Sequence, residues 1–295
     1  MQDKPKNVRC PICRKYKYPT EDHIPPRSCG NSQNTKYHFF LTDYIGSQNR
    51  TEFISQGGLK RRFLCSDCNN RLLGAGPDKE LGSLCQTAAK AISEKESSLT
   101  WEGDIKQIIV AALGHILGAM HYDKSLPAKE MRAFIHKGIV PEQSKLFLFL
   151  YPFHEIFVVR DCVAAPLKPN KQSILTEPIG LSGMYFYPLA FIYTEKENLG
   201  NGLDLFEIYQ EGETKITLNI DSWSNPITKT VLPADWPFHL DNINDNLDSG
   251  CMTMAGAAGG ESISTIPQSK GVLIKIHHKN GTLTNPATNE LLRFK

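Results

Sequence analysis

The sequence predicts an α+β protein in two parts, a small N-terminal module over residues 1–75 and a larger α+β domain over residues 76–295. Three observations predict this class. Two Cys-x-x-Cys pairs near the N-terminus indicate a hairpin that is held together by a metal ion. Apolar residues then recur at helical spacing as far as about residue 136. Beyond that point, short apolar runs and period-two alternation indicate antiparallel strands.

The two cysteine pairs, Cys10/Cys13 and Cys65/Cys68, have the spacing of structural zinc ligands. A Cys-x-x-Cys turn directs two thiolates at one point, and two such turns complete a closed tetrahedral zinc site. Bound zinc can stabilise a segment that is too small to form a hydrophobic core of its own. Cys29 is the alternative ligand, and the other three cysteines are scattered singly along the chain.

Side chains suited to phosphodiester chemistry lie between the pairs and just after them. Asp22 and His23 follow the first pair, and Asn69 and Asn70 follow the second. Hydrolysis of a phosphodiester needs a water molecule that is deprotonated near neutral pH, and imidazole has a suitable pKa for that step. It also needs a hard cation to neutralise charge on the phosphate. One carboxylate and one amide oxygen suit Mg²⁺, which keeps several waters.

This set of residues resembles the HNH nuclease family, whose ββα-metal fold consists of a hairpin and a helix. The resemblance covers about residues 8–72. It implies a metal-dependent endonuclease that hydrolyses DNA and leaves 5′-phosphate and 3′-hydroxyl ends. His23 is then the general base, and Asp22 and Asn69 are the ligands of a catalytic Mg²⁺ or Mn²⁺. Asn70 is the alternative ligand if the register is shifted by one residue.

The stretch 56–64 departs from the family pattern. The family usually places a further Asn a few residues before the second cysteine pair, where it orients the base. This stretch contains no Asn, so either another group orients His23 or the site is weaker than that of a typical member.

The resemblance leaves the role of residues 76–295 open. An HNH module contacts mainly the DNA backbone and contributes little sequence specificity. Specificity or activation is therefore expected from residues 76–295, through an activating ligand or a partner protein. Small HNH proteins with an unassigned second domain resemble the effector nucleases of bacterial anti-phage or restriction systems.

The net charge of +2 conceals an uneven distribution. Residues 1–75 carry 13 Lys and Arg against 6 Asp and Glu; of the totals of 33 and 31, this leaves 20 against 25 for residues 76–295. Positive charge therefore gathers on the part with the predicted site, where it attracts phosphate, and DNA is the predicted partner. Any one of these cations could equally belong to an ordinary solvated face. The candidate phosphate contacts are Lys60, Arg61, Arg62 and Arg71.

Two other functions remain open on the sequence alone. A zinc ribbon can bind nucleic acid or protein without cutting it, and a metal with a base can cleave RNA as well as DNA. The scattered cysteines and the N-terminal residues favour a reducing cytoplasmic location. The longest apolar run, residues 108–120, is too short to cross a bilayer, so no membrane partner is expected.

The second part contains helical patterns followed by strand patterns. His115 and His121 are six residues apart on the second helix and are expected to be core or boundary residues. A break is expected at Trp101-Glu102-Gly103, and Asn280-Gly281 predicts a hairpin after residues 272–276. The expected helices are 78–95, 104–121 and 128–136, and the expected strands are 146–151, 155–163, 183–193, 205–209 and 215–220.

Overall fold

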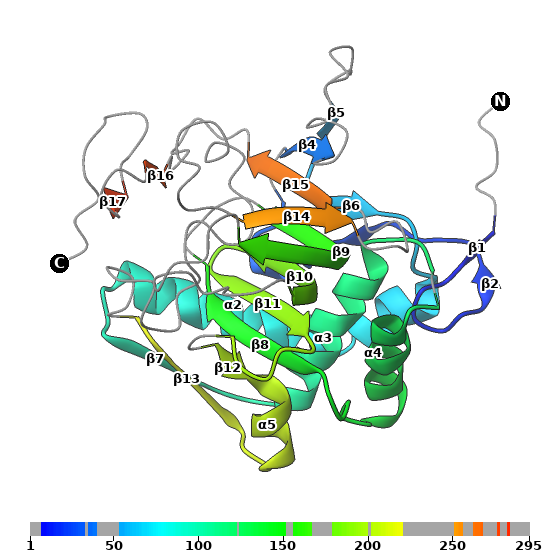
Figure 1. Cartoon of the computed structure of the whole chain (residues 1–295). Helices are drawn as coiled ribbons and strands as arrows, with labels where there is room; N and C mark the ends of the chain where they lie inside the picture. The colour runs from blue at the N-terminus through cyan, green and yellow to red at the C-terminus, as the bar shows by residue number, and fades with distance from the viewer. Residues whose placement is uncertain are drawn as a thin grey trace.

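The chain forms mixed helices and antiparallel sheets, as the sequence predicts (Figure 1). Every pairing between described strands is antiparallel. The computed structural model describes residues 7–32, 35–39, 53–122, 124–151, 156–166, 179–199, 202–220, 251–255, 262–267, 276–277 and 282–283.

A nine-stranded sheet crosses the molecule and takes strands from both predicted parts (Figure 1). In spatial order its strands are β12 (Leu203–Asp204), β8 (Lys145–Leu150), β11 (Leu189–Thr194), β10 (Ile179–Phe186), β9 (Ile156–Pro166), β15 (Ser262–Pro267), β4 (Thr35–Phe39) and β5 (Phe53–Ser55). A further strand, β14 (Cys251–Ala255), also pairs with β9. Because β4 and β5 come from residues 1–75, the sheet joins the N-terminal module to the rest of the chain.

Helix α3 (Ile105–Gly118) is the central helix of the described structure. Asp104 caps its N-terminus by accepting a hydrogen bond from the Gln107 backbone N–H at 3.2 Å. All its residues from Ile108 onward are buried, which agrees with their apolar character. The helix contacts β9, β10, α2 (Pro77–Ser93), α4 (Leu126–Lys137) and α5 (Leu205–Gln210). In the described part of the chain, no helix is long and apolar enough to span a membrane.

Two arginines bind the backbone carbonyls at the C-terminal end of α3. Arg160 on β9 donates from Nη1 to Leu117 O and His121 O, both at 3.2 Å. Arg61 donates from Nε to Ala119 O at 2.9 Å. The last carbonyls of a helix lack partners within the helix and carry partial negative charge, so cationic donors stabilise this end.

The N-terminal module consists of short strands and helical turns. Strands β1 (Val8–Arg9) and β2 (Tyr16–Lys17) pair with each other, and so do β3 (Asp22–His23) and β6 (Lys60–Arg61). The 3₁₀ turn η1 (Arg27–Cys29) follows β3, and the π-helix η2 (Asp67–Leu73) follows β6. The order β3, β6, η2 is thus strand, strand, helix.

Most of the elements expected in residues 76–220 are present. The three predicted helices correspond to α2, α3 and α4, and three predicted strands correspond to β8, β9 and β13 (Lys215–Asn219). At the C-terminus, β16 (Ile276–His277) and β17 (Thr282–Leu283) pair as the predicted hairpin requires. Its Asn280-Gly281 turn and residues 272–275 lie outside the described residues.

Three predictions in this part were wrong. The expected strand 183–193 is the hairpin β10–β11, whose two strands are buried on both faces and so read as one apolar run. The expected strand 205–209 is helix α5, because Asp204 accepts a hydrogen bond from Phe206 N at 3.0 Å and caps it. The expected break at Trp101 belongs to strand β7 (Ser98–Glu102), in which buried and exposed residues alternate. It pairs with β13.

Candidate functional site

The four predicted zinc ligands converge in the structure. The sulfur atoms of Cys10, Cys13, Cys65 and Cys68 all lie within 4.8 Å of one another. The Cys13 and Cys65 sulfurs are 3.7 Å apart. Tetrahedral zinc with Zn–S bonds of about 2.3 Å separates its sulfur ligands by roughly 3.8 Å, so the cluster has the dimensions of a zinc site.

Backbone hydrogen bonds define the first cysteine turn independently of a bound metal. Cys10 N donates to Lys15 O at 3.0 Å, and Arg14 N donates to Cys10 O at 2.9 Å. Arg14 closes the turn with a positive φ of 63°. The hydrogen bond from Cys68 lowers the pKa of the Cys10 thiol to about 4, which favours its thiolate form.

Cys29 lies outside this cluster. It is buried beside Cys85 of α2, and burial raises the pKa of its thiol well above the ordinary value. The structure thus places Cys29 in the packing between η1 and α2, and the four paired cysteines form the candidate zinc site.

The Asp-His pair occupies both residues of strand β3. Asp22 pairs in register with Arg61, and His23 pairs with Lys60. Successive side chains of a strand point to opposite faces. Asp22 is accordingly only 4% exposed and faces α3, while His23 is half-buried.

A backbone carbonyl orients the His23 ring. Its Nε2 lies 3.0 Å from Gly57 O. A carbonyl can only accept, so Nε2 carries the proton and Nδ1 of the neutral ring keeps its lone pair. Burial lowers the pKa of His23, and the nearby charges of Lys60 and Arg27 lower it further. The ring is therefore neutral near pH 7 and can accept a proton through Nδ1.

Asn31 is a positioning residue that the sequence reasoning missed. It is 3% exposed. Its Nδ2 donates to Pro25 O at 2.7 Å and to Leu59 O at 3.0 Å, and its Oδ1 accepts from Leu59 N at 2.7 Å. Asn31 thus joins the segment after His23 to the loop that supplies the Gly57 carbonyl. A β-carbon at Gly58 would lie 2.5 Å from Asn31 O, so this loop needs a glycine there.

The two asparagines after the second cysteine pair have different surroundings. Asn69 is 9% exposed, and its Nδ2 donates to Glu21 O at 2.9 Å and Thr20 Oγ1 at 3.1 Å. Asn70 is exposed and donates to Ser66 Oγ within its own turn. Asn69 is therefore the residue of η2 whose amide reaches the segment immediately before Asp22.

A buried network of charged groups connects Asp22 to the helices of the second part. His115 of α3 is completely buried, and its Nε2 is hydrogen-bonded to Asp78 Oδ1 at 2.8 Å. Its Nδ1 lies 3.4 Å from Asp22 Oδ2, close enough for an ion pair but outside hydrogen-bond geometry. Burial alone would lower the pKa of His115, but the charges of Asp78 and Asp22 outweigh it and raise that pKa to about 10. His115 is buried, as the sequence predicted, whereas His121, also expected to be a core or boundary residue, lies beyond the end of α3 and is exposed.

Each of the four candidate phosphate contacts interacts with another part of the protein, and two of them share one carboxylate. Lys60 Nζ lies 2.9 Å from Glu21 Oε1, and Arg62 Nη2 lies 3.1 Å from Glu21 Oε2. These two cations lower the pKa of Glu21, and the contribution of Lys60 is the larger. Arg61 binds the end of α3 and lies over the Phe63 ring, with 5.1 Å between guanidinium and ring centroid. Arg71 is largely exposed, 3.5 Å from Asp67 Oδ1.

Comparison of the chain with protein-family models, with curated proteins and with solved structures finds no match.

Proposed function

We propose that this chain is a divalent-metal-dependent nuclease that hydrolyses DNA phosphodiester bonds. One observation carries the proposal: within a strand–strand–helix unit beside a four-cysteine cluster, His23 is held by a carbonyl on Nε2 and is neutral near pH 7. Such an imidazole is suited to remove a proton from water.

His23 is the general base of the proposed reaction. Its Nε2–H is fixed by Gly57 O, so Nδ1 accepts the proton of the attacking water. Its lowered pKa keeps most of the protein active at neutral pH, because a protonated ring has no lone pair to offer. Gly57 O thus does the orienting that the family assigns to the Asn absent from residues 56–64.

The residues near His23 fit a catalytic Mg²⁺ or Mn²⁺. Asp22 is almost fully buried, and its Oδ2 makes no hydrogen bond among the described residues, although it faces His115 Nδ1 at 3.4 Å. Asn69 uses its Nδ2 as a donor to Thr20 and Glu21, so its Oδ1 is the atom suited to a metal. A carboxylate oxygen and an amide oxygen are hard ligands of the kind that Mg²⁺ takes. When bound, the ion neutralises charge on the phosphate and the leaving oxygen.

The four cysteines are proposed to hold a structural zinc ion. A site with four thiolates is closed and offers no position to water or substrate. Its role is to fix the β1–β2 turn against the start of η2. That arrangement keeps Asn69 against the strand that carries Asp22 and His23.

One observation favours an alternative, a zinc module that binds nucleic acid or protein without cutting it. Asp22 is almost fully buried against His115, which is how a purely structural carboxylate is held. In that case Asp22 and His23 contribute packing and hydrogen bonds, and no metal other than zinc is needed.

The test is cleavage of plasmid DNA and of single-stranded RNA by the purified protein with added Mg²⁺ or Mn²⁺. The proposal predicts that DNA is cut only when the metal is present. Cleavage of RNA alone would change the substrate class. Binding without cleavage under both metals would support the alternative.

A further inference from the structure

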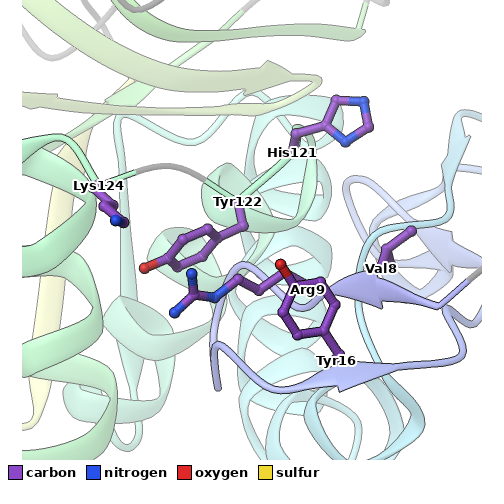
Figure 2. A pocket seen from close by; sticks show the side chains of 6 residues that line it. All are labelled: Val8, Arg9, Tyr16, His121, Tyr122 and Lys124. Carbon is purple, nitrogen blue, oxygen red and sulfur yellow. The ribbon is translucent and has the colours of Figure 1, made fainter.

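A cavity of about 350 Å³ is lined in part by the N-terminal module and has no role in the proposed chemistry. Figure 2 shows its lining side chains, three from strands β1 and β2 and three from the segment after α3. Its volume lies within the usual range of small-ligand sites, roughly 300–1,000 Å³. The lining residues are Val8, Arg9, Tyr16, His121, Tyr122 and Lys124.

The side chains of this cavity form an aromatic and cationic stack. The Arg9 guanidinium lies 4.1 Å from the Tyr122 ring centroid and 5.9 Å from that of Tyr16 (Figure 2). The buried Arg132 lies 5.0 Å from the centroid of the same Tyr122 ring. Cation–π contacts of this kind hold Tyr122 and Arg9 in fixed positions. Tyr16 is different, because it remains 69% exposed.

The cavity is positively charged. None of its six lining residues is acidic, and both Arg9 and Lys124 carry a positive charge. Asp161, which does not line the cavity, faces Arg160 at 3.7 Å and accepts a hydrogen bond from Ser125. A negatively charged ligand group is therefore attracted to the Lys124 side of the cavity.

Ring contacts link the cavity to the candidate catalytic strands. Arg61 of β6 lies over Phe63, and the Phe63 ring lies 4.2 Å from the ring of His121. His121 lines the cavity. Arg61 is the backbone pairing partner of Asp22 across β3 and β6, so these ring contacts lead from the strands of the candidate site to the cavity.

We propose that this cavity is a nucleotide subsite, in which a base stacks on Tyr16 and the attached phosphate binds Lys124 and Arg9. An exposed aromatic ring beside fixed cations is the combination with which proteins bind single-stranded nucleic acid. The inference rests on the proposed function in taking nucleic acid as the ligand. The nucleotide in this subsite belongs to the bound strand but does not flank the bond that is cleaved.

The test is the affinity of a labelled single-stranded oligonucleotide of about twelve nucleotides, within the site sizes known for such proteins. Fluorescence anisotropy is recorded without added divalent metal, so that binding is measured apart from cleavage. Tyr16→Ala should weaken binding about 5- to 100-fold, the range for losing one stacking ring. Tyr16→Phe should bind like the parent, because it keeps the ring.

The chain provides matched controls. Tyr18 is 60% exposed, two residues from Tyr16, and does not line the cavity. Tyr18→Ala should bind like the parent. Lys124→Ala should reduce the slope of log affinity against log salt by about 0.7, and Lys129→Ala should not. Zinc content measured in parallel shows whether the module is intact in each variant.

Three outcomes would overturn the subsite: no oligonucleotide binding by the parent, unchanged affinity of Tyr16→Ala, or equal losses in Tyr16→Ala and Tyr18→Ala. A mononucleotide that competes at the oligonucleotide's own affinity would assign the cavity to a free nucleotide instead of a strand. The two proposals fail separately. A parental protein that binds the oligonucleotide through Tyr16 but does not cleave DNA would support the subsite and contradict the proposed nuclease function.

Discussion

His23 and Asp22 are neighbours on one strand, yet their environments differ because their side chains point to opposite faces. Asp22 faces a fully buried histidine, and His23 is half-buried between a carbonyl and two cations. In the proposed function, the same dipeptide provides a buried carboxylate for a metal and a neutral imidazole for proton transfer. Sequence spacing identified both residues, but it could not identify His115 as the partner of Asp22.

The pH dependence of cleavage should report the environment of His23. Since burial and neighbouring cations lower its pKa, activity should fall only as pH drops through a value below 6.5. Lys60→Gln removes one of these cations and should move the acid limb of kcat/KM to higher pH. Lys79→Gln, on the exposed face of α2, should leave the limb in place. If the acid limb of kcat/KM stays at the same pH in Lys60→Gln, the assignment of His23 as the base is contradicted.

At the scale of the elements, Asn31 joins the two segments that flank the β3–β6 pairing, one after His23 and one before Lys60. Its amide makes three buried hydrogen bonds to the backbone of Pro25 and Leu59. A single sequence offers no signal for such a role, because Asn is common in loops and its partners are distant along the chain. The convergence of the four cysteines, in contrast, was predictable, because two Cys-x-x-Cys pairs have the spacing of a closed metal site.

Asn31→Ala should destabilise the protein by on the order of 2–4 kcal/mol, since each buried group that loses its partner costs about 1–3 kcal/mol. It should also lower kcat, because the loop that holds His23 through Gly57 loses its support. Asn70→Ala is the control and should change stability by less than about 0.5 kcal/mol. Urea unfolding measures both. Equal stabilities for the two variants would mean that Asn31 is not a structural link.

Zinc binding should depend on the paired cysteines alone. Cys68→Ser should lose bound zinc and melt at a lower temperature, because metal binding supplies folding free energy to this module. Cys29→Ser should keep its zinc, since Cys29 is buried beside Cys85 and outside the cluster. Elemental analysis of both purified variants provides the comparison. Full zinc content in Cys68→Ser would rule out the four-cysteine site.

At the scale of the whole molecule, the sequence predicted helices α2, α3 and α4 and some of the described strands, such as β8, β9 and β13, but not how they connect. Helices α2 and α4 have an apolar face, α3 is apolar along most of its length, and all three have end signals. The pairing of β4 with β15 brings together residues more than 200 positions apart, and no local pattern encodes such a contact. Helix α5 was misassigned because a short apolar run fits both a helix and a strand.

The predicted boundary near residue 75 stays a prediction, and the contacts across it suggest one cooperative unit. Ser28 Oγ donates to Asp78 O at 2.9 Å, and Arg132 Nη1 donates to Pro11 O at 3.1 Å. The hydrophobic core also continues across the boundary. We therefore expect a single calorimetric transition, with the calorimetric enthalpy equal to the van't Hoff value. Two resolved transitions would mean that the parts unfold separately.

The most direct test of the proposed function is the cleavage rate of His23→Ala beside that of His136→Ala. His136 is a matched control, because its Nε2 also lies at a backbone carbonyl, Ile12 O at 3.2 Å. If His23 is the base, His23→Ala should cut DNA about a hundred- to ten-thousand-fold more slowly, with unchanged zinc content, melting temperature and DNA affinity. His136→Ala should cut at the parental rate. A His23→Ala protein that cuts as fast as the parent would contradict the proposed mechanism.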